Sequence, residues 1–275
     1  MALSAERNMF DMLDNCIPFE VEPCQPLLTI YVDGTNTGCA GDTPPEGWKE
    51  EWRQEEEGDE IACGRIGDYS AFIFRSRGAY VGTLRCREDY REAKLTVGKI
   101  PKLALDNAMM IAYALATANS GTLLFHASVV SRKGRAYMFL GPSGTGKSTH
   151  TRLWLKYIDG TSLLNDDNPV VRLDGDGLPV VYGSPWSGKT PCYKAESYRL
   201  GAIVRLRQAP YNRISQMNVL EAYSVMSSSV SGKRWDRSIA DGLHATLEAM
   251  ASTTDVWQME CLPDEAAAVM TSSTI

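Results

Sequence analysis

"FLGPSGTGKSTH", residues 139–150, contains the pattern G-x-x-x-x-G-K-S, and the segments on either side of it extend the signal. An apolar, strand-like run precedes the glycines, and a helical pattern follows Lys147 as far as Gly160. Glycines allow successive backbone N–H groups to turn inward around an anion, and the helix that follows adds the positive end of its dipole. Strand, glycine loop and helix together predict a phosphate-binding loop.

The residues of this loop have separate expected roles. Lys147 is expected to contact the β- and γ-phosphates of a nucleotide, and the Ser148 hydroxyl to ligate Mg²⁺. ATP is the expected nucleotide, with GTP equally compatible because no base-reading motif stands out. The expected nucleotide-binding residues are Gly141, Pro142, Ser143, Gly144, Thr145, Gly146, Lys147, Ser148 and Thr149.

A second signal follows in "LLNDDNPVV", where Asp166 and Asp167 come nineteen and twenty residues after Lys147. One helix and one short strand fill that distance, so the end of the strand can return beside the loop. Two carboxylates there can divide the work: one holds Mg²⁺ and the other accepts a proton from an attacking hydroxyl. The competing interpretation is a polar turn at the end of a strand, since D-D-N-P is good turn chemistry.

Further candidates are weaker. His126 lies in the apolar run "LLFHASVV", where a lone histidine is usually a core residue; the functional interpretation is that it reaches the Asp pair and tunes the base. "GSPWSGKT", residues 183–190, is a second small-residue loop in which Trp186 and Lys189 are candidates to contact substrate, although it also fits a plain connection. Arg205 is a candidate to neutralise phosphate charge, or simply a solvated residue on a strand.

The pattern of elements predicts an α/β fold with a mixed parallel and antiparallel sheet. Hairpins are expected around the turn at residues 132–135 and the turn at residues 174–177, on either side of the nucleotide-binding segment. A plain doubly wound sheet would alternate strand and helix throughout. Residues 1–100 are expected to form a small β-rich domain, with edge strands in residues 18–33, and residues 101–275 the nucleotide-binding domain.

An acidic segment, residues 46–60, carries eight acids against Lys49 and Arg53. A solvated loop or exposed helical turn is the simpler interpretation. The alternative is a docking surface for a basic partner, with Trp48 and Trp52 as anchors.

Composition limits the function classes. The 275 residues carry a net charge of −6 and a pI near 5.2, which argues against a general nucleic-acid binder. The seven cysteines have irregular spacings that favour free thiols in a reducing compartment. With no signal peptide and no apolar run of spanning length, the expected location is the cytoplasm, away from membranes.

The HAS-bearing hairpin at His126, GPSGTGKS and the double Asp together resemble the catalytic domain of HPr kinase/phosphorylase and its relatives, whose core is related to that of phosphoenolpyruvate carboxykinase. The resemblance covers roughly residues 103–265 and is sharp between residues 126 and 167. It implies that Asp166 is the general base, that Asp167 and Ser148 serve the metal, and that Lys147 is the loop lysine. Assembly into homo-oligomers is also implied.

Two departures from the family concern the acceptor. The E-I/V/L-R-G-x-G segment that follows the double Asp in HPr kinase is absent, and Thr149 stands where that family has Glu. The resemblance therefore points to HPr-kinase-related proteins, without identifying HPr as the acceptor or the reverse phosphorolysis as a reaction.

The leading hypothesis is a kinase that uses ATP and Mg²⁺ to phosphorylate a hydroxyl, expected to be that of a serine, in a peptide, protein or small molecule. The alternative is a nucleotide-binding regulatory or scaffold protein with little turnover, whose working surface would be residues 46–60.

Overall fold

The computed structural model describes residues 1–35, 45–188 and 190–275. The chain divides into two compact units. The first comprises Met1–Ile17 and Val21–Ala116, and the second comprises Pro18–Glu20 and Thr117–Ile275. Residues 101–116, which were expected in the second domain, thus group with the first unit.

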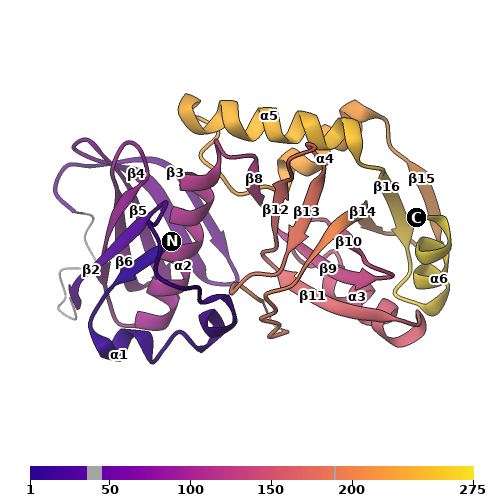
Figure 1. Cartoon of the computed structure of the whole chain (residues 1–275), viewed down its shortest axis with the longest axis horizontal. Helices are drawn as coiled ribbons and strands as arrows, with labels where there is room; N and C mark the ends of the chain where they lie inside the picture. Colours follow the sequence, from indigo (N-terminus) through magenta and orange to yellow (C-terminus); the bar gives the residue numbers. More distant parts are fainter. Residues whose placement is uncertain (36–44, 189) are drawn as a thin grey trace. The chain divides into compact units, whose positions relative to one another are not determined.

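The first unit is built on a sheet of seven strands in the described residues, with helix α2 (Pro101–Thr117) packed against it (Figure 1). A Cβ added to Gly82 in the sheet would lie 3.2 Å from the Cβ of Ala104 in α2, so helix and sheet approach closely there. Two short helices, α1 (Arg7–Phe10) and the 3₁₀ helix η1 (Asp14–Phe19), follow the first strand. In spatial order the strands are β1 (Ala2–Ser4), β2 (Thr29–Thr35), β7 (Glu92–Val97), β6 (Ala79–Cys86), β5 (Tyr69–Ser76), β4 (Asp59–Ile66) and β3 (Trp48–Glu56).

The acidic segment corrects one expectation, because residues 48–56 form the edge strand β3 and not a loop or helical turn. Its charges pair within the strand and across strands: Arg53 bonds Glu50 of β3 and Glu60 of β4, and Glu60 also pairs with Arg75 of β5. Charged side chains are a common feature of sheet edges, where they discourage pairing with other chains. Trp48 packs against its own sheet, so it does not serve as an exposed anchor.

Edge strands expected in residues 18–33 are also corrected. Residues 21–28 carry no strand, and β2 runs between β1 and β7 in the interior of the sheet. The prolines at 18, 23 and 26 remove backbone donors, so the strand begins only after them, at Thr29.

The second unit contains a mixed sheet, as predicted. The strands follow the spatial order β11 (Thr161–Asp167), β9 (Ala127–Arg132), β10 (Arg135–Leu140), β14 (Ser197–Gln208), β13 (Pro179–Tyr182), β12 (Val170–Leu173) and β8 (Thr122–Leu124). The hairpin of β9 and β10 and the hairpin of β12 and β13 are both confirmed, while β10 and β14 run parallel. Beside β14 lies β16 (Val256–Cys261), which also pairs with β15 (Arg213–Gln216).

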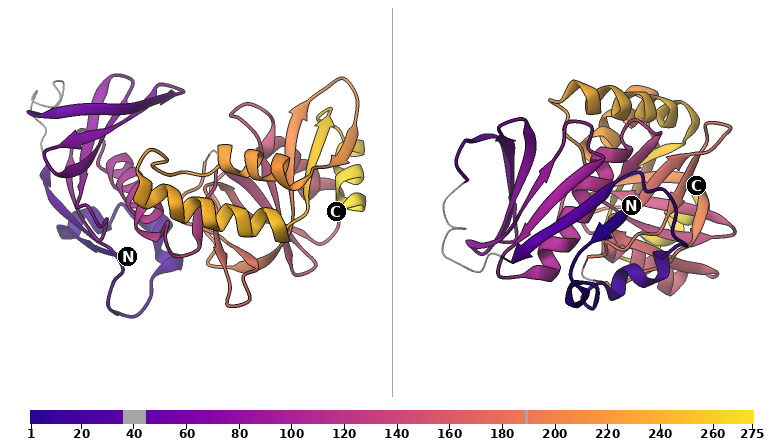
Figure 2. Two further views of the ribbon diagram at one scale, coloured as in Figure 1. Left: turned by 90° about the horizontal axis from the view of Figure 1, so that it is seen from above. Right: turned by 60° about the vertical axis from the view of Figure 1, so that its left-hand side comes forward.

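Helices cover this sheet in two pairs. Helices α3 (Lys147–Tyr157) and α6 (Glu265–Thr274) contact each other, and residues of both join one apolar cluster with β10, β14 and β16. Helices α4 (Val219–Ser228) and α5 (Arg237–Thr253) lie side by side (Figures 1 and 2). Strand β15 and helix α6 were not expected from the sequence. Within the described residues, every helix is too short or too polar to cross a membrane.

Candidate functional site

The glycine loop, residues 141–146, connects the end of β10 to the start of α3. Gly141 has a φ of 152°, and a Cβ there would lie 3.0 Å from Thr145 Oγ1 and 3.3 Å from the Leu206 carbonyl oxygen. Gly146 is the N-cap of α3 with a φ of 104°, and no side chain caps the helix. Because the first amides of an α-helix have no acceptor within the helix, this end of α3 is suited to an anion.

Lys147 opens α3 and its side chain folds back over the loop. Its Nζ donates to the carbonyl oxygen of Gly141 at 2.9 Å and of Pro142 at 3.4 Å. The residue is only 8% exposed. The ammonium group is therefore held at the loop, where it can exchange carbonyl oxygens for those of a phosphate.

Strand register brings the Asp pair to the loop. Ala127 of β9 pairs with Leu140 on one side and with Asp167 on the other. The end of β11 thus lies two strands from the residue that precedes the glycine loop. The predicted return of the Asp pair beside the loop follows from this antiparallel pairing.

The two aspartates have different surroundings, beginning with Asp166. The Ser148 hydroxyl donates to Asp166 Oδ1 at 2.9 Å, and Asp166 is only 5% exposed. The expected metal pair was Ser148 with Asp167, so the residue that contacts Ser148 is the one expected to be the base. A hydroxyl and a carboxylate oxygen form a donor set that suits Mg²⁺, which keeps waters and substrate phosphates as its other ligands.

Asp167 faces a more open environment. Its side chain is 39% exposed, and its Oδ1 lies 3.8 Å from Nε2 of His126, which is 38% exposed. Asn168 Nδ2 donates to Asp167 Oδ2 at 2.7 Å. The backbone of Asp167 has a φ of 151°, a value that costs energy for a residue with a Cβ and recurs at functional sites. His126 is therefore not a core histidine.

A second loop, described at residues 183–188 and 190–192, lies against the Asp pair. The Gly188 amide donates to the Asp166 carbonyl at 2.7 Å, and the backbone of Ser187 pairs with that of Asp167 in an isolated antiparallel β-bridge. A Cβ on Gly188 would approach the Asp166 carbonyl oxygen to 3.2 Å, so a glycine permits this close packing. The loop predicted to line a substrate cleft is thus adjacent to the backbone of Asp166 and to Asp167.

The three residues predicted to contact substrate, Trp186, Lys189 and Arg205, have different outcomes. Trp186 is buried at 7% exposure, so its ring belongs to the interior and not to an open cleft wall. Lys189 lies outside the described residues. Arg205 is exposed on β14 between the buried Val204 and Leu206, and it pairs in register with Leu140 at the entrance to the glycine loop. Since Leu206 packs toward α3, Arg205 projects from the opposite face of the sheet.

Asn165 is a residue that sequence reasoning missed. It is fully buried, and its Nδ2 donates to Ser184 Oγ at 3.1 Å and to the Trp186 carbonyl at 3.3 Å. The amide therefore ties the second loop to the strand that carries the Asp pair. The only sequence signal was an amide residue between the apolar pair Leu163 and Leu164 and the Asp pair.

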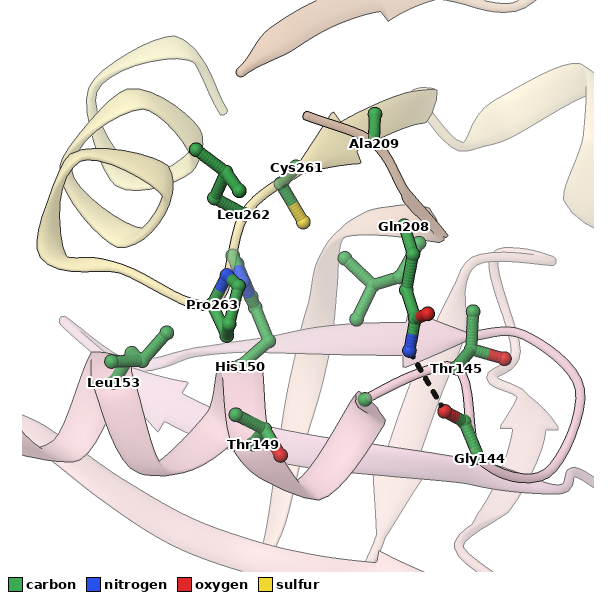
Figure 3. A pocket seen from close by; sticks show the side chains of 12 residues that line it. Gly144, Thr145, Thr149, His150, Leu153, Gln208, Ala209, Cys261, Leu262 and Pro263 are labelled. Carbon is green, nitrogen blue, oxygen red and sulfur yellow. Dashed lines mark hydrogen bonds between the residues drawn. The ribbon is translucent and has the colours of Figure 1, made fainter. Parts of the chain in front are cut away.

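A pocket of about 660 Å³ adjoins the glycine loop on the side of β14 and β16, away from the Asp pair (Figure 3). Its walls come from the loop, from α3, from the end of β14 and from the segment between β16 and α6. Gln208 Nε2 donates to the Gly144 carbonyl at 3.1 Å and links β14 to the loop. No sequence motif marked this pocket, because its residues come from segments about 60 positions apart.

Metal-binding clusters were also sought among the side chains. In the described part of the chain, no three His, Cys, Asp or Glu residues lie together as a metal site.

His150 behaves as a structural residue of α3. It is buried, its Nε2 lies 3.2 Å from Trp154 Nε1, and burial lowers its pKa to about 4. Between pH 6.5 and pH 4 the unfolded chain binds a proton at this residue that the folded chain does not. The free energy of unfolding therefore decreases as the pH is lowered through this window. We expect this residue to remove about 2 kcal/mol of unfolding free energy between pH 7 and pH 5.

Urea unfolding at pH 7 and pH 5 measures this effect. His150→Gln keeps a hydrogen-bonding group without titrating, and it should lose less stability on acidification than the unmodified chain. His244→Gln, at a largely exposed histidine on α5, is the matched control and should leave the acid sensitivity unchanged. Equal acid sensitivity in the His150→Gln chain would contradict the assignment.

Comparisons with known proteins give little more. No family model and no curated protein sequence matches the chain. Among solved structures, it is similar to the HPr(Ser) kinase/phosphatase from Coxiella burnetii, with a TM-score of 0.31 and 8% identity, over 55% of this chain and 91% of that chain. That protein belongs to the family that residues 126–167 resemble. The likeness is distant and says nothing of the substrate or activity of this chain.

Proposed function

We propose that this protein is a kinase that uses a nucleoside triphosphate, ATP or GTP, and Mg²⁺ to phosphorylate a hydroxyl group. The observation that carries the proposal is the hydrogen bond from Ser148 to Asp166, which joins the G-K-S of the glycine loop to the Asp pair. A phosphate-holding loop next to a solvent-facing carboxylate is the minimum apparatus for moving a phosphoryl group to an alcohol.

Ser148 and Asp166 would hold the metal. Their oxygens lie 2.9 Å apart, so both can face one small cation. Mg²⁺ bound there would neutralise charge on the β- and γ-phosphates as the transfer proceeds. This assignment exchanges the two aspartates relative to the roles that the family resemblance implies, and it is supported by the different surroundings of the two side chains.

Asp167 would be the general base, with His126 as its partner. Its exposed carboxylate can reach an incoming acceptor, whereas Asp166 is buried and already engaged by Ser148. Asp167 accepts the proton of the acceptor hydroxyl while that oxygen bonds to the γ-phosphorus. The bond from phosphorus to the β,γ-bridging oxygen breaks, and the nucleoside diphosphate leaves. His126, with its Nε2 3.8 Å from Asp167 Oδ1, orients the carboxylate.

A serine hydroxyl, free or in a peptide, is the acceptor class that we propose. The proposal is supported by the resemblance of residues 126–167 to the HPr-kinase-related proteins. Ser187 and Gly188 pack closely against Asp166 and Asp167, so the acceptor must approach the carboxylate of Asp167 beside this loop.

The test is incubation of the purified chain with γ-labelled ATP and Mg²⁺, alone, with L-serine, with serine-containing peptides, and with an extract from its source. Label in a new species that requires both the protein and Mg²⁺ is the expected result. Label in no species, from a chain shown to bind ATP, would instead support the nucleotide-binding regulatory protein, for which the charged edge strand β3 is the candidate working surface.

A further inference from the structure

We infer that the pocket beside the glycine loop binds the base and ribose of the nucleotide, so that the substrate lies across β10 with its reactive end at β11 and its base over β14 and β16. The inference rests on the proposed function, and it adds a subsite for the nucleoside to the proposed phosphate-binding site.

The order of strands places the two ends of the nucleotide. The Asp pair ends β11, which is separated from β10 by β9. The pocket is built on β14, which flanks β10 on its other side, and on β16 beyond it. An acceptor hydroxyl must meet the γ-phosphate at the Asp pair, so the pocket is on the wrong side of the loop for the acceptor and on the correct side for the nucleoside.

The residues of helix α3 support the same placement of the nucleotide. Ser148 contacts Asp166, whereas the next residue, Thr149, lines the pocket together with Leu153 one turn later. Residues four apart share one helix face, so this face of α3 continues from the phosphate end of the loop into the pocket. A triphosphate held at Lys147 and Ser148 would therefore direct its nucleoside along Thr149 and Leu153.

The chemistry of the walls fits a flat heterocycle. The inner wall is apolar, with Leu153, Leu206, Ala209, Leu262 and Pro263, while the entrance at Gly144 and Gly146 is backbone. Ligand pockets typically enclose about 300–1,000 Å³ and combine apolar walls with a few polar groups, and a pocket of about 660 Å³ is large enough for a nucleoside. Gln208, which bonds Gly144, supplies a polar group at the boundary between loop and pocket.

Cys261 makes the pocket accessible to experiment in the unmodified chain. It lines the pocket, and Figure 3 shows its sulfur turned toward the cavity. Burial raises the pKa of this thiol, so alkylation is best followed at pH 8.5. Cys24, an exposed cysteine of the first unit, is the internal reference for reagent access.

The experiment compares Mg·ATP with Mg·tripolyphosphate, which carries the phosphates without a base, at saturating concentrations of each. Maleimide labelling of Cys261 and Cys24 is followed by mass spectrometry. ATP should slow the labelling of Cys261 at least fivefold without changing that of Cys24, and tripolyphosphate should leave both rates within twofold of the value without ligand.

Calorimetry with the same ligands provides the second measurement. ATP should bind at least tenfold more tightly than tripolyphosphate, and Leu153→Ser should lower the affinity for ATP at least fivefold while leaving tripolyphosphate unchanged. Leu155→Ser, an exposed leucine on the same helix away from the pocket, is the matched control and should change neither.

The outcomes separate this inference from the proposed function. Equal affinity for the two ligands, or binding of ATP without protection of Cys261, would overturn the base subsite and leave the phosphate loop intact. Binding of neither ligand would overturn the proposed function, and the subsite with it.

Discussion

Replacing Asp167 by Asn should lower the rate of phosphoryl transfer by about 10²–10⁴-fold while leaving the affinity for Mg·ATP nearly unchanged. The amide keeps the shape of the side chain but cannot accept the proton of the acceptor. In the proposed assignment the glycine loop, Ser148 and Asp166 hold the nucleotide and its metal, while Asp167, 3.8 Å from His126, acts on the acceptor, so the affinity for Mg·ATP is expected to change little. Steady-state kinetics with labelled ATP, combined with calorimetry, separate the two quantities.

Asp166→Asn is the companion variant that tests the division of roles. Loss of the carboxylate next to Ser148 should raise the Mg²⁺ concentration required for half-maximal rate at least tenfold, and excess Mg²⁺ should recover part of the rate. Asp176→Asn, at an exposed aspartate in the β12–β13 turn, removes the same charge and should change neither quantity. If Asp167→Asn raised the Mg²⁺ requirement and Asp166→Asn did not, the roles implied by the family resemblance would hold and ours would be wrong.

The elements around the glycine loop could be predicted because their signals are local. Glycines at residues 141, 144 and 146 adopt positive φ angles, and the apolar run before them and the helix after them are contiguous with the loop. The two flanking hairpins are also local, each with its turn signal between two apolar runs. Such short-range patterns depend little on the rest of the fold.

The failures share a different origin. Residues 46–60 have the composition of a solvated loop, yet they form an edge strand, because pairing with β4 satisfies the backbone while the charges remain in water or pair across strands. Helix α6 has a weakly amphipathic sequence, and its placement depends on Trp154 and the rest of the cluster it covers. Tertiary contacts therefore determine that residues 48–56 form a strand and where helix α6 packs.

The arrangement of the site could not be predicted from the sequence either, because it also depends on tertiary contacts. Adjacent residues on a strand point to opposite faces, so only one of Asp166 and Asp167 can approach Ser148. Which one does so depends on the register of β11 against β9, where an irregularity occurs between Leu163 and Asn165. A shift of one residue would exchange the two carboxylates. The spacing from Lys147 predicts that a carboxylate reaches the loop without specifying which.

Lys147→Ala should weaken the binding of Mg·ATP at least about 100-fold, equivalent to about 3 kcal/mol. The Lys147 ammonium lies at the loop on the carbonyl oxygens of Gly141 and Pro142, within a site that excludes most solvent. Charge-assisted bonds to phosphate are stronger than the carbonyl contacts they replace, and the methyl group of alanine offers neither. Calorimetry gives the affinity directly, and the shift of the melting temperature by saturating Mg·ATP gives it independently.

Two further variants make this prediction specific to the position of the charge. Lys156→Ala removes the same charge from the exposed last turn of α3 and should leave binding within twofold. Lys147→Arg keeps the charge, but a planar guanidinium is broader than an ammonium and does not fit between two carbonyls of a closed loop, so it should recover only part of the affinity. Full affinity in the Lys147→Ala chain would mean that the glycine loop does not hold the triphosphate. An equal loss in Lys156→Ala would mean that the measured attraction is the general field of the helix and not a contact at the loop.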